Sequence, residues 1–203
     1  MMRKKICILD YGVGNYNSVK NAFLGLDFPC FITSDLNHLS SSDLIILPGV
    51  GSFPAAMSAL HSLGLVEFLR DIAHSGHPML GLCLGMQLFA DESLENGVTS
   101  GLSLIPGKVV PLGGGDFHIG WNTIKVVGND CLLLPSDGNH FYFNHSLEFK
   151  TSIEYQLCVS NVSHPCVTGV RHKNVVGLQF HPEKSQDCGR VLLKHVVKKL
   201  TNG

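Results

Sequence analysis

The stretch PMLGLCLGMQLFADE, residues 78–92, decides how the rest of the sequence can be interpreted. Its first part, MLGLC, is an uninterrupted apolar run, which is typical of a strand buried on both faces of a parallel sheet. A helix-like segment, LGMQLFADE, follows without any turn residues, so that Cys83 stands at the junction. A nucleophile at such a sharp strand-to-helix turn is held exposed on strained backbone, and Gly81 and Gly85 allow the turn to close. The stretch therefore predicts an α/β fold with a reactive cysteine at the carboxyl end of a strand.

Short apolar runs alternate with amphipathic segments through the first half of the chain. KICIL, CFIT and DLIIL are expected strands, whereas residues 17–26 and 53–76 have helical spacing. From about Val109 the strand-like pieces become shorter, which suggests additional, partly antiparallel strands, and residues 189–200 predict a final helix. We expect a single domain spanning residues 1–203, with a mixed, mainly parallel central sheet and helices on both faces.

The composition excludes several classes of protein. The 203 residues, 44% of them hydrophobic, are enough to bury one substantial core. Charges of both signs are scattered and sum to −1, so we expect no nucleic acid partner and no membrane partner. The apolar start of the chain ends at Asp10, too early for a signal peptide or a membrane span, which favours a cytoplasmic protein. The seven cysteines form no CxxC pair, which favours reduced thiols, and no metal or cofactor is predicted.

A thiolate nucleophile needs a base, and the segment GLQFHPEKS, residues 177–185, supplies one. An apolar strand ends there at His181, Pro182 stops the strand, and Glu183 follows two residues after the histidine. The carboxylate can hold one imidazole nitrogen while the other nitrogen faces Cys83. A lone histidine after a strand is usually a surface or core residue, so this interpretation depends on the cysteine at the sharp turn.

A third strand ends in LIILPGVGSF, residues 44–53. Gly49 and Gly51 allow backbone N–H groups to approach a reacting carbonyl oxygen closely, as an oxyanion hole requires. Taken alone, PGVG is an ordinary turn. Because the carboxyl ends of parallel strands share one edge of a sheet, three strand ends with complementary parts predict one site.

Together, PGVGSF, GLCLGMQ and GLQFHPEKS resemble the three signatures of class I, triad-type glutamine amidotransferases. That resemblance covers essentially the whole chain and implies the flavodoxin-like sheet of the class. Within the class, LDYGVGNYNSVKNAF, HIGWNTI and FYFNHS resemble the glutaminase subunit of imidazole glycerol phosphate synthase. In that family the subunit is paired with a (β/α)₈ cyclase that uses the released ammonia, which implies a heterodimer.

The resemblance implies a role for each matching residue. Cys83 would attack the side-chain amide of L-glutamine, His181 would protonate the departing ammonia and then activate water, and Glu183 would orient His181. The remaining assignments are grouped by role. Oxyanion donors would be the N–H groups of Leu84 and of Val50 or Gly51; the glutamine would be bound by Gly49, Gln87, Glu95, Tyr142, His145 and Ser146; and the partner would contact Asn15, Ser18, Trp121 and Lys184.

Two departures from the family pattern concern the expected partner-facing region. GGGDFHIGWN lacks the basic residue and the proline that usually precede this segment, and Asn144 and Leu147 replace an apolar and an aromatic residue. We expect the triad and the glutamine site to be unaffected by these changes. Without the resemblance, Trp121 would be taken for a core residue.

Three alternatives remain open. The chain could serve a synthase that amidates a sugar nucleotide for surface polysaccharides. A cysteine peptidase or glyoxalase-like protein on the same fold would place histidine directly after the cysteine, whereas Leu84 follows Cys83 here. A non-catalytic binding module could also retain the fold. If 203 residues hold no ammonia-accepting domain, we expect an obligate partner, with weak glutaminase activity alone that rises when the partner binds its own ligand.

Overall fold

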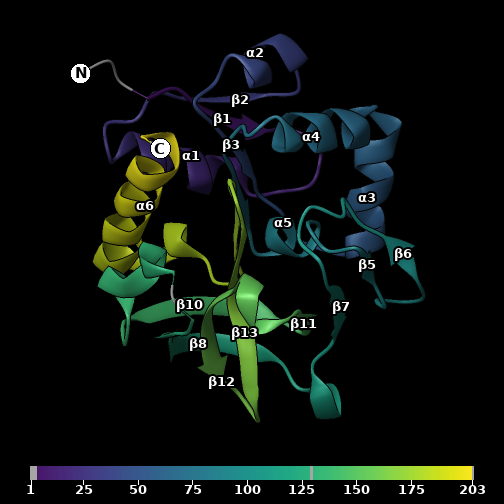
Figure 1. Cartoon of the computed structure of the whole chain (residues 1–203), viewed down its shortest axis with the longest axis vertical. Coiled ribbons are helices and arrows are strands. Elements are labelled where there is room, and N and C mark those ends of the chain that lie inside the picture. The colour runs from purple at the N-terminus through teal and green to yellow at the C-terminus, as the bar shows by residue number, and fades with distance from the viewer. Residues whose placement is uncertain (1–3, 129, 203) are drawn as a thin grey trace.

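An eight-stranded sheet forms the centre of the computed structural model, which describes residues 4–128 and 130–202 (Figure 1). The strand order is β2-β1-β3-β4-β14-β13-β12-β9. Strands from β2 to β14 in this order run parallel, and those from β14 to β9 run antiparallel. Their bounds are β1 (Ile6–Leu9), β2 (Cys30–Thr33), β3 (Leu44–Leu47), β4 (Met79–Leu82), β9 (Lys125–Val126), β12 (Gln156–Asn161), β13 (Pro165–His172) and β14 (Val175–Leu178). The predicted mixed, mainly parallel sheet is confirmed.

Helices cover both faces of this sheet, because side chains alternate along each strand between two separate cores. In β1, Ile6 and Ile8 belong to one core, whereas Cys7 and Leu9 belong to the other. The first core packs against α1 (Tyr16–Leu24) and α6 (Gln186–Thr201), and the second against α3 (Phe53–Ser62), α4 (Leu65–His74) and α5 (Leu84–Gln87). The short helix α2 (Leu36–Ser40) connects β2 to β3.

One predicted helix is shorter than expected, and one helical region is divided. Residues 53–76 form two helices, α3 and α4, because Gly64 adopts φ +66° between them and ends the helical path. The segment after Cys83 is helical only over Leu84–Gln87. Residues 102–105 donate hydrogen bonds to the carbonyl groups of the residues that follow α5. The Leu102 N–H donates to the Leu88 carbonyl oxygen and the Leu104 N–H to the Phe89 carbonyl oxygen, each at 2.9 Å. These bonds replace the next turn of the helix.

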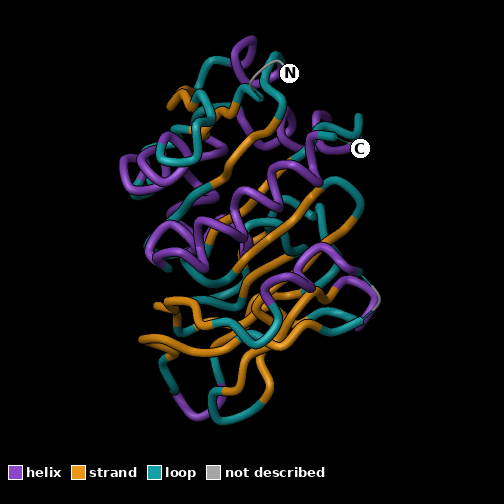
Figure 2. Tube along the Cα trace, turned by 90° about the vertical axis from the view of Figure 1, so that its left-hand side faces the viewer, coloured by secondary structure: helices purple, strands orange, loops and turns teal. Residues whose placement is uncertain are grey.

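Two smaller sheets lie beside the carboxyl ends of the parallel strands. One pairs β8 (His118–Thr123) with β10 (His140–His145), and a bridge between Tyr142 and His181 joins β10 to the segment after β14. The other joins β5 (Glu92–Ser93), β6 (Thr99–Ser100), β7 (Lys108–Pro111) and β11 (Leu147–Lys150). Strands and loops accordingly dominate the lower end of the molecule in Figure 2. The expected change to shorter, partly antiparallel strands near Val109 is confirmed.

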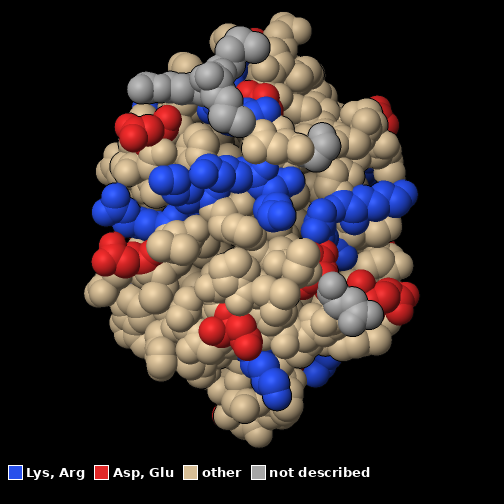
Figure 3. Space-filling view, turned by 60° about the vertical axis from the view of Figure 1, so that its left-hand side comes forward, with Lys and Arg blue, Asp and Glu red and all other residues tan. Residues whose placement is uncertain are grey.

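The charges are less evenly scattered than the sequence suggests. Lys and Arg side chains form a band across the face on which α6 lies (Figure 3). Helix α6 contributes basic residues at helical spacing, including Arg190, Lys194 and Lys198. These residues lie close together only because the segment is helical. The formal net charge of −1, which is a sum over the whole chain, therefore gives no indication of this band.

Candidate active site

Cys83 occupies a strained turn between β4 and α5. Its φ of +53° and ψ of −110° lie in a region that L-residues rarely adopt, and the residue is 7% exposed. A Cβ on Gly85 would overlap the carbonyl group of Leu47, and a Cβ on Gly81 would lie 2.5 Å from the Gly85 carbonyl oxygen. Only glycine fits on both sides, so the backbone can reverse within the turn and present the sulfur at the carboxyl edge of the sheet.

His181 and Glu183 lie directly after β14, the strand that neighbours β4. The Nδ1 of His181 donates a hydrogen bond to Oε1 of Glu183 at 2.7 Å, and the two side chains are only 5% and 3% exposed. The backbone N–H of His181 donates to the Tyr142 carbonyl oxygen at 2.8 Å, which fixes the position of the ring. The structure therefore brings the three predicted triad residues to adjacent strand ends.

The surroundings of His181 favour its protonated form. Burial alone would lower the pKa of His181, but hydrogen bonds to Cys83 and Glu183, and the negative charges of these groups, raise it to about 9. The imidazole is therefore an imidazolium at neutral pH. The ring can therefore donate a proton to a group that binds beside the Cys83 sulfur.

Gln179 is a site residue that the sequence reasoning missed. It is fully buried, and its Nε2 lies 3.6 Å from the sulfur of Cys83. Its Oε1 accepts a hydrogen bond from Gln87 Nε2 at 3.0 Å, so the two amides orient each other beside the nucleophile. A signal was present, because Gln179 is the single polar side chain in VVGLQF and lies two residues before His181, on the same side of the strand.

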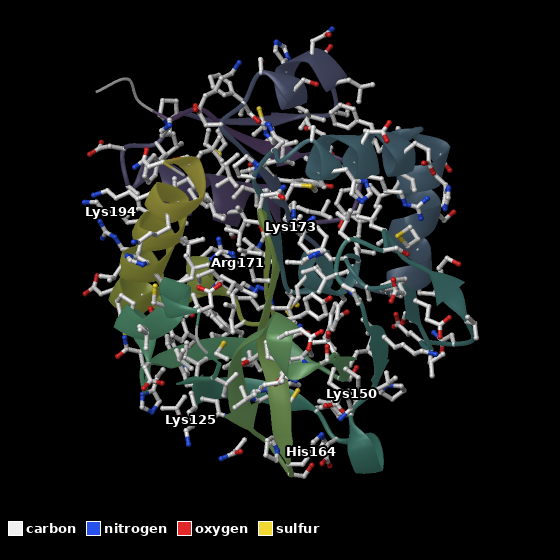
Figure 4. The ribbon with its side chains drawn as sticks, in the orientation of Figure 1. Lys125, Lys150, His164, Arg171, Lys173 and Lys194 are labelled. Atoms are coloured by element: carbon white, nitrogen blue, oxygen red, sulfur yellow. The ribbon has the colours of Figure 1, made fainter. Side chains whose placement is uncertain are left out.

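A cavity of about 330 Å³ opens beside the sulfur. Ten of the predicted site residues line it: Cys83, His181, Val50, Gly51, Leu84, Gln87, Glu95, His145, Ser146 and Lys184. A larger hollow of about 590 Å³ lies at the amino ends of the parallel strands, where Arg171 and Lys173 line it. Figure 4 labels both of these cations. This hollow is at the opposite edge of the sheet and contains none of the triad residues.

Two residues predicted to bind glutamine lie outside the cavity lining. Gly49 is enclosed, since a Cβ there would lie 2.7 Å from the Tyr11 hydroxyl oxygen and 2.9 Å from Leu84 Cβ. The ring of Tyr142 instead faces Trp121, with 6.2 Å between the ring centroids, and Lys184 Nζ lies 5.8 Å from its centroid. Neither residue lines the cavity beside the sulfur.

One carboxylate oxygen of Glu95 accepts a backbone hydrogen bond. Its Oε2 accepts a hydrogen bond from the Phe53 N–H at 2.6 Å, at the first turn of α3, where unpaired N–H groups and the helix dipole favour an anion. Glu95 also lines the cavity, so its side chain is held at the cavity wall by this bond.

His145 belongs to a chain of hydrogen bonds that leads away from the cavity. Its Nδ1 donates to the Leu147 carbonyl oxygen at 2.7 Å, and its Nε2 lies 2.9 Å from Nδ1 of His118, whose Nε2 lies 2.9 Å from Nδ2 of Asn122. Burial lowers the pKa of both histidines to about 4. Both rings are therefore neutral at pH 7, with tautomers determined by these partners.

Two of the departures from the family pattern fall at the cavity itself, and that they leave the glutamine site unaffected stays a prediction. Asn144 and Leu147 both line the cavity, and the Asn144 carbonyl oxygen lies 4.0 Å from the sulfur of Cys83. Asn144 lies on β10 and Leu147 begins β11, so two different strands bring these residues to the cavity.

The four predicted interface residues fall into two groups. Asn15 caps α1, since its side chain accepts a hydrogen bond from the Ser18 N–H at 3.3 Å, which gives both residues a structural role. Trp121 is 50% exposed rather than in the core, and it lies with Lys184 beside Tyr142 at the edge of the cavity.

Within residues 4–128 and 130–202, no group of three or more His, Cys, Asp or Glu side chains could hold a metal ion. The helices in the same ranges are all too short or too polar to cross a membrane.

A parallel sheet with a cysteine at a strained turn, and a histidine and glutamate at the next strand end, defines a class of enzyme. The chain belongs to the class-I glutamine amidotransferase family, whose model matches residues 8–199. Membership of this family excludes the cysteine peptidase and glyoxalase-like alternatives.

Its relatives include proteins named imidazole glycerol phosphate synthase subunit HisH. The protein from Halalkalibacterium halodurans is 40% identical over 198 residues, covering 93% of this chain and 92% of the relative. The one from Lactococcus lactis is 37% identical, covering 97% and 100%, and the one from Methanothermobacter thermautotrophicus is 37% identical, covering 95% and 98%.

Solved structures show the same fold at lower sequence identity. A glutamine amidotransferase crystal structure has a TM-score of 0.78 at 19% identity and covers 98% of this chain and 99% of that chain. The PurLQS structure from Thermotoga maritima has a TM-score of 0.78 at 18% identity, with coverage of 98% and 100%.

Proposed function

We propose that this protein is the glutaminase subunit of an imidazole glycerol phosphate synthase and supplies ammonia for histidine biosynthesis. The observation that carries the proposal is the Cys83, His181 and Glu183 arrangement at adjacent strand ends, beside a cavity lined by amide, carboxylate and histidine side chains. The names of relatives about 40% identical over more than 90% of the chain support the choice of pathway.

The geometry supports a two-step hydrolysis. In the first step the thiolate of Cys83 attacks the side-chain carbonyl carbon of L-glutamine, and the S–C bond forms while charge develops on the carbonyl oxygen. The N–H of Leu84 and an N–H from Val50 or Gly51 would receive that charge. His181 donates its proton to the departing nitrogen, the C–N bond breaks, and ammonia and a glutamyl thioester result.

In the second step the roles of the histidine reverse. The neutral imidazole of His181 takes a proton from a water molecule, whose oxygen attacks the thioester carbonyl, and the S–C bond breaks to release glutamate and the thiolate. Glu183 stabilises the imidazolium and holds the ring through Nδ1 in both steps. Glu95 and Gln87 are suited to bind the ammonium and carboxylate groups of the substrate.

A partner subunit is part of the proposal. Large apolar side chains are exposed near the cavity mouth: Phe117 at 68%, Ile119 at 62%, Trp121 at 50% and Val50 at 43%. Three of these lie within or next to β8, and adjacent exposed apolar residues of this kind often mark a protein interface. We propose that an ammonia-accepting cyclase subunit covers them in a cytoplasmic heterodimer.

The sugar-nucleotide pathway is the second candidate. Its supporting observation is the sequence GGGDFHIGWN, which departs from the usual pattern in the partner-facing region. Because the relatives reported above carry the synthase name, we prefer histidine biosynthesis. A non-catalytic module would leave the complete triad without a role.

The test is glutamate formation by the purified chain mixed with the cyclase subunit of the same organism, with and without the cyclase's nucleotide ligand. We expect weak hydrolysis by the chain alone, stimulation in the ternary mixture, and no hydrolysis by Cys83→Ala. Full activity of Cys83→Ala would refute the mechanism. Binding without stimulation, or no binding, by an otherwise active chain would refute the histidine pathway.

A further inference from the structure

Tyr11 is a buried tyrosine with one specific hydrogen bond. It follows β1 closely and is 1% exposed, and its hydroxyl donates to the Pro48 carbonyl oxygen at 2.6 Å. Burial, together with the neighbouring Tyr16 and Cys83, raises the pKa of Tyr11 well above its usual value, so the hydroxyl remains a donor. A buried phenol without a hydrogen-bond partner is unfavourable. The partner of Tyr11 is a backbone carbonyl group in the loop after β3.

That loop carries the predicted oxyanion donors. Pro48 begins the segment that includes Gly49, Val50 and Gly51, and Gly51 has a φ of +100°. The carbonyl group held by Tyr11 belongs to the peptide unit directly before the one that carries the Val50 N–H. Since successive peptide units share a Cα atom, fixing the first limits the orientations available to the second.

Gly49 lies between Tyr11 and the second part of the oxyanion hole. A Cβ on Gly49 would lie 2.7 Å from the Tyr11 hydroxyl oxygen on one side and 2.9 Å from Leu84 Cβ on the other. The phenol, the glycine and Leu84 are therefore packed without a gap. The distance between the loop after β3 and the residue after the nucleophile depends on this packing.

We propose that Tyr11 is a positioning residue for glutamine hydrolysis: its hydroxyl fixes the peptide unit after Pro48 and thereby holds the loop N–H groups in place opposite the N–H of Leu84. The inference rests on the proposed glutaminase function. It assigns to the segment after β1 a role in the chemistry, separate from its capping of α1 through Asn15.

The neighbouring loop shows how this positioning is reinforced. The Tyr11 N–H donates to the Tyr16 hydroxyl at 3.3 Å, and a Cβ on Gly14 would lie 3.0 Å from the Tyr16 ring and 3.5 Å from Pro48. Residues 11–16 therefore pack against Pro48 as well, and a movement of this loop would displace the oxyanion segment.

Tyr11→Phe tests the proposal, because it keeps the buried ring and removes only the hydroxyl. Tyr155→Phe is the matched control, since Tyr155 is partly buried and lies against His172, outside the cavity lining. Both variants are assembled with the cyclase subunit, and kcat and KM for glutamine are measured. In parallel, Cys83 is alkylated with iodoacetamide, a displacement at carbon that forms an S–C bond, releases iodide and requires no oxyanion hole.

For Tyr11→Phe we expect kcat to fall at least about tenfold, with KM and the alkylation rate within about twofold of the native values. Tyr155→Phe should leave all three unchanged. A native kcat in Tyr11→Phe, or an equal fall in kcat and alkylation, would overturn the inference. If Tyr11→Phe does not fold, Gly49→Ala provides the second test, because its methyl group displaces the same loop and should give the same fall in kcat with native alkylation. An inactive native complex would instead count against the proposed function.

Discussion

Glu183→Gln removes the negative charge beside His181 and keeps the shape of the side chain. The carboxylate lies 2.7 Å from the imidazole nitrogen, and both side chains are at most 5% exposed, so solvent screens their interaction poorly. The pKa of His181 is raised from 6.5 to about 9 by Cys83 and Glu183 against the effect of burial. An opposite charge at this distance accounts for roughly one to three pH units of such a shift.

The measurement is the pH dependence of kcat for glutamine hydrolysis by the assembled complex. Because the protonated His181 must donate to the departing ammonia, the native rate should decline as the pH rises through about 9. In Glu183→Gln this decline should move to lower pH by roughly one to three units, and the maximal kcat should fall because the imidazolium loses its partner.

Glu148→Gln is the matched control. The Glu148 side chain is 4% exposed and also lies beside a histidine, His164, at 3.1 Å, but it does not line the cavity. Figure 4 shows His164 together with Lys150 at the lower end of the molecule. This variant should keep the native decline near pH 9. An unchanged pH profile in Glu183→Gln, or an equal change in both variants, would refute the assignment of Glu183 as the partner of His181.

Three further predictions concern stability and assembly. Gly85→Ala places a methyl group on the Leu47 carbonyl, so it should lower the free energy of unfolding in urea by about 2 kcal/mol or more and lower kcat about 100-fold. The control is Gly25→Ala, whose methyl group meets no atom closer than 3.4 Å and should change that free energy by less than about 1 kcal/mol. His118 and His145 both have a pKa of about 4 in the folded chain, so the unfolded chain takes up these two protons first. The free energy of unfolding should fall by up to about 1.4 kcal/mol per pH unit for each histidine between pH 6.5 and 4, and a flat denaturation series would contradict this. Trp121→Ala should leave the melting temperature nearly unchanged but weaken cyclase binding about tenfold or more in a titration, and an unchanged Kd would remove Trp121 from the interface.

Local sequence alone determined the elements that carry the catalytic groups. The apolar run before Cys83, the glycines on either side of it, and Pro182 after His181 each act within a few residues, through steric limits on the backbone. The same reasoning predicted a sheet covered on both faces, because uninterrupted apolar strands need two cores, as β1 has. Glycine at position 85 is required by contact with β3, yet it was recognisable from the pattern around the cysteine.

Only the tertiary structure decided which of these groups meet. Gln179 reaches the sulfur and Gln87 across more than 90 positions of sequence because β14 pairs with β4 in one register, and a shift by one residue would turn it to the other face. The early end of α5 depends on residues 102–105, and the exposure of Trp121 depends on which face of β8 is left uncovered. Backbone sterics act between neighbours and can be deduced from sequence, whereas contacts between distant segments depend on strand register and packing, which emerge only when the whole chain has folded.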